Sequence, residues 1–257
     1  MKRTFNTTGA CDAEYHYMLP PEARLSDLQS FIDERLYFVL HAARQTGKTT
    51  AMRAFAARLR ENGYAAVWAT LETSQGMTEV AQAEPVWLTA IEQASKTLPT
   101  QWKAPKAETF FKRAIGTRLQ QYLQTWSEKL PVPLVLLLDE ADVVSGPAMI
   151  SLLRQLRAGF FERGVGKFPT SVALIGMRDL RDYLTQSKDG TPANPGSPFN
   201  IKSESITLRN FTEDEVGTLY AQHTQDTGQI FTPESVQQAF YWTQGQPFLV
   251  NALARIS

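Results

Sequence analysis

Residues 37–50 read YFVLHAARQTGKTT: a short apolar run, a loop, and the start of a polar-apolar segment. The run LYFVLH at 36–41 has the composition of a strand that is buried on both faces. Residues 48–61 have helical spacing and are followed by Asn62-Gly63, a typical helix end. The loop fits the phosphate-binding pattern G-x-x-x-x-G-K-[ST] except at its first position, where Ala42 stands. Strand, loop and helix together predict a phosphate-binding loop.

Each residue type in this loop suits an anionic ligand. Gly47 lets the backbone approach a phosphate closely, and Lys48 supplies a flexible positive charge. Thr49 offers a hydroxyl group to Mg²⁺, and the new helix adds its positive dipole end. Ala42 fits the first position if its φ is negative or if modest strain is accepted there. The predicted binding residues are Ala43, Arg44, Gln45, Thr46, Gly47, Lys48, Thr49 and Thr50. The alternative is an ordinary helix start with an exposed lysine.

A second apolar run, LVLLL at 134–138, ends in Asp139-Glu140. In a parallel sheet the ligand sits at the carboxyl ends of the strands, so these carboxylates are expected beside Lys48 and Thr49. We predict that Asp139 holds Mg²⁺ with Thr49, directly or through water. Glu140 is predicted to act as the general base that activates water. The alternative is a solvated acidic turn.

A third buried run, SVALIG at 171–176, is followed by Met177, Arg178 and Asp179. Arg178 is predicted to reach the γ-phosphate, while Asp179 holds the guanidinium group or caps the next helix. A surface ion pair is the alternative. Arg154 and Arg157, three residues apart, are candidates for arginine fingers in trans, although a solvated helix face is the favoured interpretation.

Apolar strands that alternate with helices predict an α/β fold with a parallel sheet covered on both faces. We expect strands at 36–41, 64–71, 134–138, 171–176 and 203–209, helices at 21–35, 48–61, 85–98, 108–129, 147–163, 178–185, 212–226, 233–243 and 246–256, and a surface loop at 186–200. The predicted domains are a core at 1–209, with an N-terminal arm, and a small all-helical domain at 210–257. The helical pattern runs to Ser257, which indicates a fragment of a longer protein.

The amino-acid composition excludes or disfavours several classes of protein. The 26 Lys+Arg balance the 26 Asp+Glu, which disfavours a dedicated nucleic-acid coat or a polybasic membrane binder. One cysteine and three scattered histidines exclude an intrachain disulfide and disfavour a Cys or His metal site. Apolar runs are too short to span a membrane, and no signal-peptide core follows Met1. We expect a cytoplasmic protein.

With these motifs the chain resembles the AAA-like branch of P-loop ATPases, most of all the prokaryotic group related to STAND signalling ATPases and origin-recognition initiators. The resemblance rests on YFVLHAARQTGKTT (37–50), LVLLLDEAD (134–142), SVALIGMRD (171–179) and TQGQPFLVNAL (243–253). It implies a doubly wound five-stranded sheet of order 5-1-4-3-2 and a helical lid at 210–257.

The same resemblance implies further site residues. A strand-end arginine is the sensor in STAND relatives, which transfers to Arg178. Their G-x-P motif matches Gly245-Gln246-Pro247 and places Pro247 by the adenine, although proline also simply favours a first helical turn. The segment before the first strand lines the base pocket in related ATPases, which makes Tyr17, Arg24 and Leu25 candidates, with Met18 a weaker one.

The sequence therefore favours an Mg-ATP-dependent switch that hydrolyses ATP slowly and acts on a protein partner or an attached effector domain. The first alternative is an ATP-dependent DNA-binding or recruitment protein similar to origin or transposition ATPases, with local basic patches at 58–63 and at Arg154/Arg157. The second is a nucleotide-bound scaffold without hydrolysis, which the Asp139-Glu140 pair disfavours. The sequence is compatible with a homo-oligomer. Absence of an N-K-x-D base-reading motif favours ATP over GTP.

Overall fold

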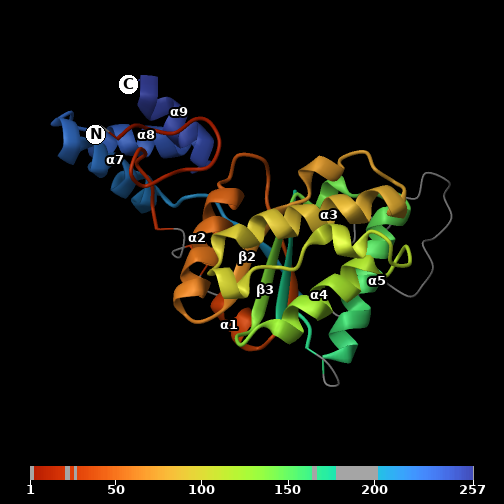
Figure 1. Cartoon of the computed structure of the whole chain (residues 1–257). Helices are drawn as coiled ribbons and strands as arrows, with labels where there is room; N and C mark the ends of the chain where they lie inside the picture. The colour runs from red at the N-terminus through yellow and green to blue at the C-terminus, as the bar shows by residue number, and fades with distance from the viewer. Residues whose placement is uncertain (1–2, 21–23, 26–27, 164–166, 178–201, 257) are drawn as a thin grey trace. The chain divides into compact units, whose positions relative to one another are not determined.

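The computed structural model describes residues 3–20, 24–25, 28–163, 167–177 and 202–256 (Figure 1). The chain divides into two compact units. The sheet unit comprises residues 27–41 and 56–206. The helical unit comprises residues 1–26, 42–55 and 207–257.

The sheet unit is built on five strands in the order β2-β3-β4-β1-β5. The strands are β1 (Tyr37–His41), β2 (Ala65–Thr70), β3 (Leu134–Asp139), β4 (Ser171–Gly176) and β5 (Lys202–Thr207). The pairs β2–β3, β3–β4 and β4–β1 are parallel. The predicted fold class and the strand order 5-1-4-3-2 are confirmed, because fully apolar runs such as LVLLL have to be buried on both faces of a sheet.

Helices cover both faces of this sheet. The α-helices in the described residues are α1 (Leu28–Asp33), α2 (Lys48–Glu61), α3 (Val80–Ala94), α4 (Arg118–Lys129), α5 (Gly146–Glu162), α7 (Glu213–Thr227), α8 (Pro233–Thr243) and α9 (Pro247–Ile256). Tyr37 and Val39 share one buried core with α3, α4 and α5. Phe38 points to the opposite face, where its ring lies 5.5 Å from that of Phe31 in α1. In Figure 1, α3 and α4 lie on the same side of β2 and β3.

The helix predicted at 108–129 is wrong in its first ten residues. Ala107–Phe110 form a short 3₁₀ helix, and α4 begins only at Arg118. Gly116 adopts a φ of +83°, which interrupts the helix. The carboxylate of Glu84 accepts hydrogen bonds from the backbone N–H groups of Gly116 and Arg118, at 3.1 and 3.2 Å. A buried side chain from α3 thus defines the start of α4.

Helix α3 begins at Val80, earlier than the predicted 85–98, and continues through Pro85. Proline has no N–H to donate to the carbonyl group four residues before it. That carbonyl belongs to Ala81, and it accepts a hydrogen bond of 3.3 Å from Nη1 of Arg118. The arginine replaces the missing donor, so the helix tolerates the proline.

In the helical unit the N-terminal arm packs on α7–α9. Phe5 and Tyr17 share a buried cluster with Val216 and Tyr220, and Arg3 pairs with Asp226 at 3.0 Å. The arm, 42–55 and the C-terminal helices therefore form one compact unit. The predicted domain boundary at 209/210 stays a prediction.

Several expectations fall outside the described residues: the helix at 178–185, the loop at 186–200, and the roles of Arg178 and Asp179. Within the described part of the chain, none of the helices combines the length and apolar character needed to cross a membrane.

Candidate functional site

The loop between β1 and α2 folds around its own lysine. Nζ of Lys48 donates hydrogen bonds to the carbonyl oxygens of Ala42 (2.7 Å) and Ala43 (2.8 Å). The hydroxyl group of Thr46 donates to the same Ala43 carbonyl at 2.9 Å. Lys48 is only 8% exposed, so the interpretation as an exposed lysine at a helix start is wrong.

The backbone of the loop explains which positions need glycine. Gly47 has a φ of +84° and Gln45 a φ of +61°, both in the left-handed region. Ala42 is not among the described residues with positive φ, as expected for an alanine at the first position of the pattern. Ala43, Arg44 and Gln45 are exposed, while Thr49 and Thr50 are half-buried at the start of α2.

Arg24, a candidate from the arm, joins three segments of the helical unit. Its Nη2 donates to the carbonyl oxygen of Thr46 at 2.9 Å, and its Nε donates to that of Arg209 at 2.9 Å. Its guanidinium carbon lies 5.0 Å from the centroid of the Phe211 ring. Burial, with the charge of Arg209 adding to it, lowers the pKa of Arg24 to about 10. Arg24 therefore holds the loop, the arm and the entry to α7 together.

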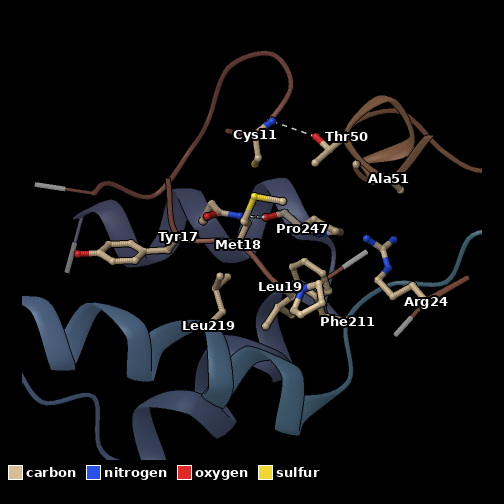
Figure 2. Close-up of a pocket in the computed structure, with 13 residues that line it drawn as sticks. Cys11, Tyr17, Met18, Leu19, Arg24, Thr50, Ala51, Phe211, Leu219 and Pro247 are labelled. Carbon is tan, nitrogen blue, oxygen red and sulfur yellow. Dashed lines mark hydrogen bonds between the residues drawn. The ribbon is translucent and has the colours of Figure 1, made fainter. Parts of the chain in front are cut away.

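A pocket of about 60 Å³ lies within the helical unit (Figure 2). It brings together four of the residues expected at the base: Tyr17, Met18, Arg24 and Pro247. Gly47 and Thr50 of the loop line it too, whereas Leu25 is buried elsewhere. The lining residues that the sequence did not single out are Cys11, Leu19, Pro20, Ala51, Phe211, Leu219 and Asn251.

Some of these residues carry a signal that is visible only in three dimensions. The backbone N–H of Cys11 donates to the hydroxyl group of Thr50 at 2.9 Å, which brings the arm to the first turn of α2. The side-chain amide of Asn251 donates to the carbonyl of Pro247 at 2.7 Å. Its carbonyl oxygen Oδ1 is buried and has no hydrogen-bond partner among the described residues. An unsatisfied buried acceptor beside a pocket indicates a missing donor.

The Gly245-Gln246-Pro247 motif lies where its residue types are required. Gly245 has a φ of +68°, and a Cβ there would overlap the carbonyl group of Phe211. Pro247 begins α9, as expected at a first helical turn. The side-chain amide of Gln246 donates to the carbonyl of Arg44 at 3.3 Å. The motif therefore contacts the phosphate-binding loop directly.

In the sheet unit, β3 ends in the predicted carboxylate pair. Asp139 is 1% exposed, and its two oxygens accept from the backbone N–H of Glu140 (2.9 Å) and from the indole of Trp68 (3.1 Å). Glu140 is half-buried and has a φ of +54°. The tight turn gives the two carboxylates separate surroundings, so a solvated acidic turn does not describe Asp139.

A further carboxylate, Asp142, connects β3 to the end of β4. Its Oδ2 accepts from the backbone N–H of Met177 at 2.9 Å, and a Cβ on Gly176 would lie 3.0 Å from its Cγ.

The two candidate finger residues lie on α5, where Arg154 is exposed and the guanidinium carbon of Arg157 lies 5.6 Å from the centroid of the Phe161 ring. The finger role of these two arginines stays a prediction.

Solved structures with the same fold have low sequence identity to this chain. The Walker-type ATPase PABY2304 of Pyrococcus abyssi aligns with a TM-score of 0.63 and 14% identity, over 98% of this chain and 70% of that one. The ORC1 protein of Aeropyrum pernix, solved in complex with DNA, aligns with a TM-score of 0.56 and 15% identity, over 93% of this chain and 60% of that one. Cdc6p of Pyrobaculum aerophilum aligns with a TM-score of 0.52 and 14% identity, over 90% of this chain and 59% of that one. The chain thus spans about three fifths of the last two proteins.

No curated protein sequence matches the chain significantly. The sequence model of the family described as "AAA domain" matches residues 32–184, more than half of the chain, including both the loop at 42–50 and the carboxylates at 139–140. The chain therefore belongs to the AAA domain family of P-loop ATPases.

Proposed function

We propose that this chain binds Mg-ATP, hydrolyses it slowly, and acts as a nucleotide-dependent switch for a protein partner or an attached effector. The observation that carries the proposal is the pocket of the helical unit, which combines the phosphate-binding loop with a mainly apolar chamber. A nucleotide joins an aromatic base to a chain of phosphates, so it needs an apolar pocket directly beside a phosphate-binding loop.

The loop supplies the phosphate end. Nζ of Lys48 now donates to two loop carbonyls, and the same donors can turn to phosphate oxygens. The backbone amides of the loop, together with the first turn of α2, favour negative charge. Mg²⁺ bound with the nucleotide would neutralise charge on the phosphates, and Thr49 and Asp139 are the ligands that the sequence predicts for it. From the sequence we propose that Glu140 accepts the proton of the attacking water and that Arg178, outside the described residues, contacts the γ-phosphate.

The apolar chamber supplies the base end. Tyr17, Met18 and Pro247 line it, and Asn251 offers an acceptor. The exocyclic amino group of adenine is a donor, whereas guanine has a carbonyl oxygen in that position. The orphaned Oδ1 of Asn251 therefore favours adenine, in agreement with the absence of a guanine-reading motif.

A switch needs a ligand whose affinity differs between two conformations. The pocket is lined by the arm, by the loop and by α7 and α9, so a nucleotide held there changes the packing free energy among these segments. We infer that nucleotide state controls the position of the C-terminal helices. Recruitment to DNA is the alternative, favoured by the fold similarity to an ORC1 protein that was solved with DNA.

The test is steady-state phosphate release with Mg-ATP, with and without duplex DNA, for the wild type, Lys48→Ala and Glu140→Gln. We expect turnover to be lost in both variants, while Glu140→Gln still binds ATP. Glu128→Gln, an exposed carboxylate outside the site, is the matched control. Binding without turnover in the wild type would support the scaffold instead, and stimulation by DNA would support recruitment.

A further inference from the structure

A second cavity, of about 560 Å³, lies at the opposite edge of the sheet from Asp139 and Glu140. Its lining comes from the amino ends of the strands: Arg35 precedes β1, Leu134 begins β3, and Thr170 precedes β4. Its volume is in the range of small-molecule sites. The family's nucleotide site lies at the carboxyl ends, so this cavity is a separate feature of the sheet unit.

All charged side chains that line this cavity are positive. Arg35, Arg163 and Lys167 line it, and none of its lining residues is acidic. In the described part of the chain, the recorded ion pairs do not include any of these three cations. Three positive charges around one cavity without a carboxylate attract an anion.

Arg163 is held rigidly. Its Nη1 donates to the carbonyls of Arg35 (3.0 Å) and Thr170 (2.9 Å), and its guanidinium carbon lies 3.8 Å from the centroid of the Phe160 ring. Burial lowers the pKa of Arg163, and the positive charge of Arg35 lowers it further. The guanidinium group is thus partly removed from water, and an anionic ligand would compensate for the lost hydration.

The cavity also has an apolar wall with one unused polar group. Leu130, Val132 and Phe168 line it, and Ser127 is 5% exposed. The hydroxyl group of Ser127 is buried and has no hydrogen-bond partner among the described residues. A buried hydroxyl without a partner is unusual in a native protein and would be satisfied by a ligand that accepts a hydrogen bond from it.

We propose that this cavity binds a small organic anion, in which a phosphate or carboxylate group is carried by an apolar body. The cations and the Ser127 hydroxyl group bind the anionic head, and the apolar wall holds the body. A DNA backbone would use the cations but not an apolar recess, because its phosphates contact exposed surfaces. The proposal does not depend on ATP binding at the loop.

The probe is phenyl phosphate, titrated into the full chain by calorimetry, with benzoate, inorganic phosphate and benzyl alcohol as comparison ligands. We expect one site for phenyl phosphate and for benzoate, weaker binding of inorganic phosphate, and none of benzyl alcohol. Lys167→Gln and Arg35→Asn each remove one charge, and each is expected to weaken phenyl phosphate binding about tenfold. Asparagine suits position 35, where φ is +58°.

Two controls make the result specific. Lys129→Gln removes an exposed lysine of α4 that does not line the cavity, and it is expected to leave the affinity unchanged. Lys48→Ala is also expected to leave it unchanged, which separates this cavity from the phosphate-binding loop. Ser127→Ala is expected to weaken binding without lowering the melting temperature, because the hydroxyl has no partner to lose.

Four results would overturn the proposal: no binding of phenyl phosphate or benzoate at millimolar concentration, equal affinity in wild type and cavity variants, loss of binding in Lys48→Ala, or equal binding of benzyl alcohol. Displacement of phenyl phosphate by a duplex oligonucleotide, with the same sensitivity to Lys167→Gln, would replace the small anion with DNA. Failure of ATP turnover affects none of these outcomes.

Discussion

The indole Nε1 of Trp68 donates a hydrogen bond of 3.1 Å to Oδ2 of Asp139. Thr70, two residues further along β2, pairs with Asp139 in the sheet register, so the indole reaches toward the carboxyl end of the neighbouring strand. With the backbone N–H of Glu140 on Oδ1, both carboxylate oxygens are engaged. The orientation of the proposed Mg²⁺ ligand is thus fixed by a side chain from another strand.

Loss of the Trp68 indole is expected to destabilise the fold through Asp139. Trp68→Phe removes a donor to a buried carboxylate, which corresponds to about 1.5–3 kcal/mol in the free energy of unfolding. Because the substitution also removes packing, the decisive measurement is a double-mutant cycle with Asp139→Ala in urea. We expect a coupling of about 1–3 kcal/mol. Additive effects would show that the hydrogen bond contributes nothing.

Asn251 is expected to determine the preference for adenine. Asn251→Leu removes the orphaned acceptor, so ATP affinity is expected to fall about tenfold and the preference for ATP over GTP to disappear. Stability is expected to change little, since loss of the hydrogen bond to the Pro247 carbonyl is offset by removal of a buried acceptor without a partner. Equilibrium binding of both nucleotides and a urea titration measure these effects. Gln238→Leu, an exposed amide on α8, is the control; unchanged selectivity in Asn251→Leu would contradict the assignment.

Glu215 is expected to make the helical unit sensitive to acid. Two hydrogen bonds from Arg209, at 2.6 and 2.8 Å, and one from the backbone N–H of Thr212, hold its pKa below the usual value. A carboxylate with a depressed folded pKa stabilises the protein above its unfolded pKa, about 4.3, and this is lost as pH falls through the folded value.

The measurement for Glu215 is thermal melting between pH 6 and pH 3. Glu215→Gln is expected to lower the melting temperature at pH 6 and to flatten its fall at acid pH. Glu213→Gln, a neighbouring exposed carboxylate in the first turn of α7, is expected to have little effect on either. Parallel curves for wild type and Glu215→Gln would rule out this origin of acid sensitivity.

Two helical glycines are expected to respond in opposite ways to alanine. A Cβ on Gly159 in α5 would overlap the ring of Phe168, which forms part of the wall of the second cavity. Overpacking of about 1–3 kcal/mol is expected to exceed the gain of about 1 kcal/mol in helix propensity. A Cβ on Gly217 in α7 meets Val236 at 3.6 Å, an ordinary contact. Gly217→Ala is expected to stabilise by about 0.5–1 kcal/mol, and urea unfolding of both variants decides; a gain in both would exclude the clash.

The parallel sheet and the phosphate-binding loop could be predicted from local sequence patterns. Strands such as LVLLL and SVALIG are nearly continuous apolar runs, and only a parallel sheet covered on both faces buries them. The phosphate-binding loop can be recognised from Gly47-Lys48-Thr49 alone, because the turn, the charge and the helix start are adjacent in the chain. The order of the strands followed from resemblance, and the structure confirmed it.

The start of α4 and the lining of the pocket depend on contacts between distant parts of the chain. Glu84 and Gln155, from α3 and α5, cap the first N–H groups of α4, and no pattern within 108–129 contains that information. The partners of Arg24, the carbonyls of Thr46 and Arg209, lie 22 and 185 residues away in the chain. Periodicity reports which face of an element is buried, whereas hydrogen bonds and cavities depend on which elements meet, and that is set by packing across the whole fold.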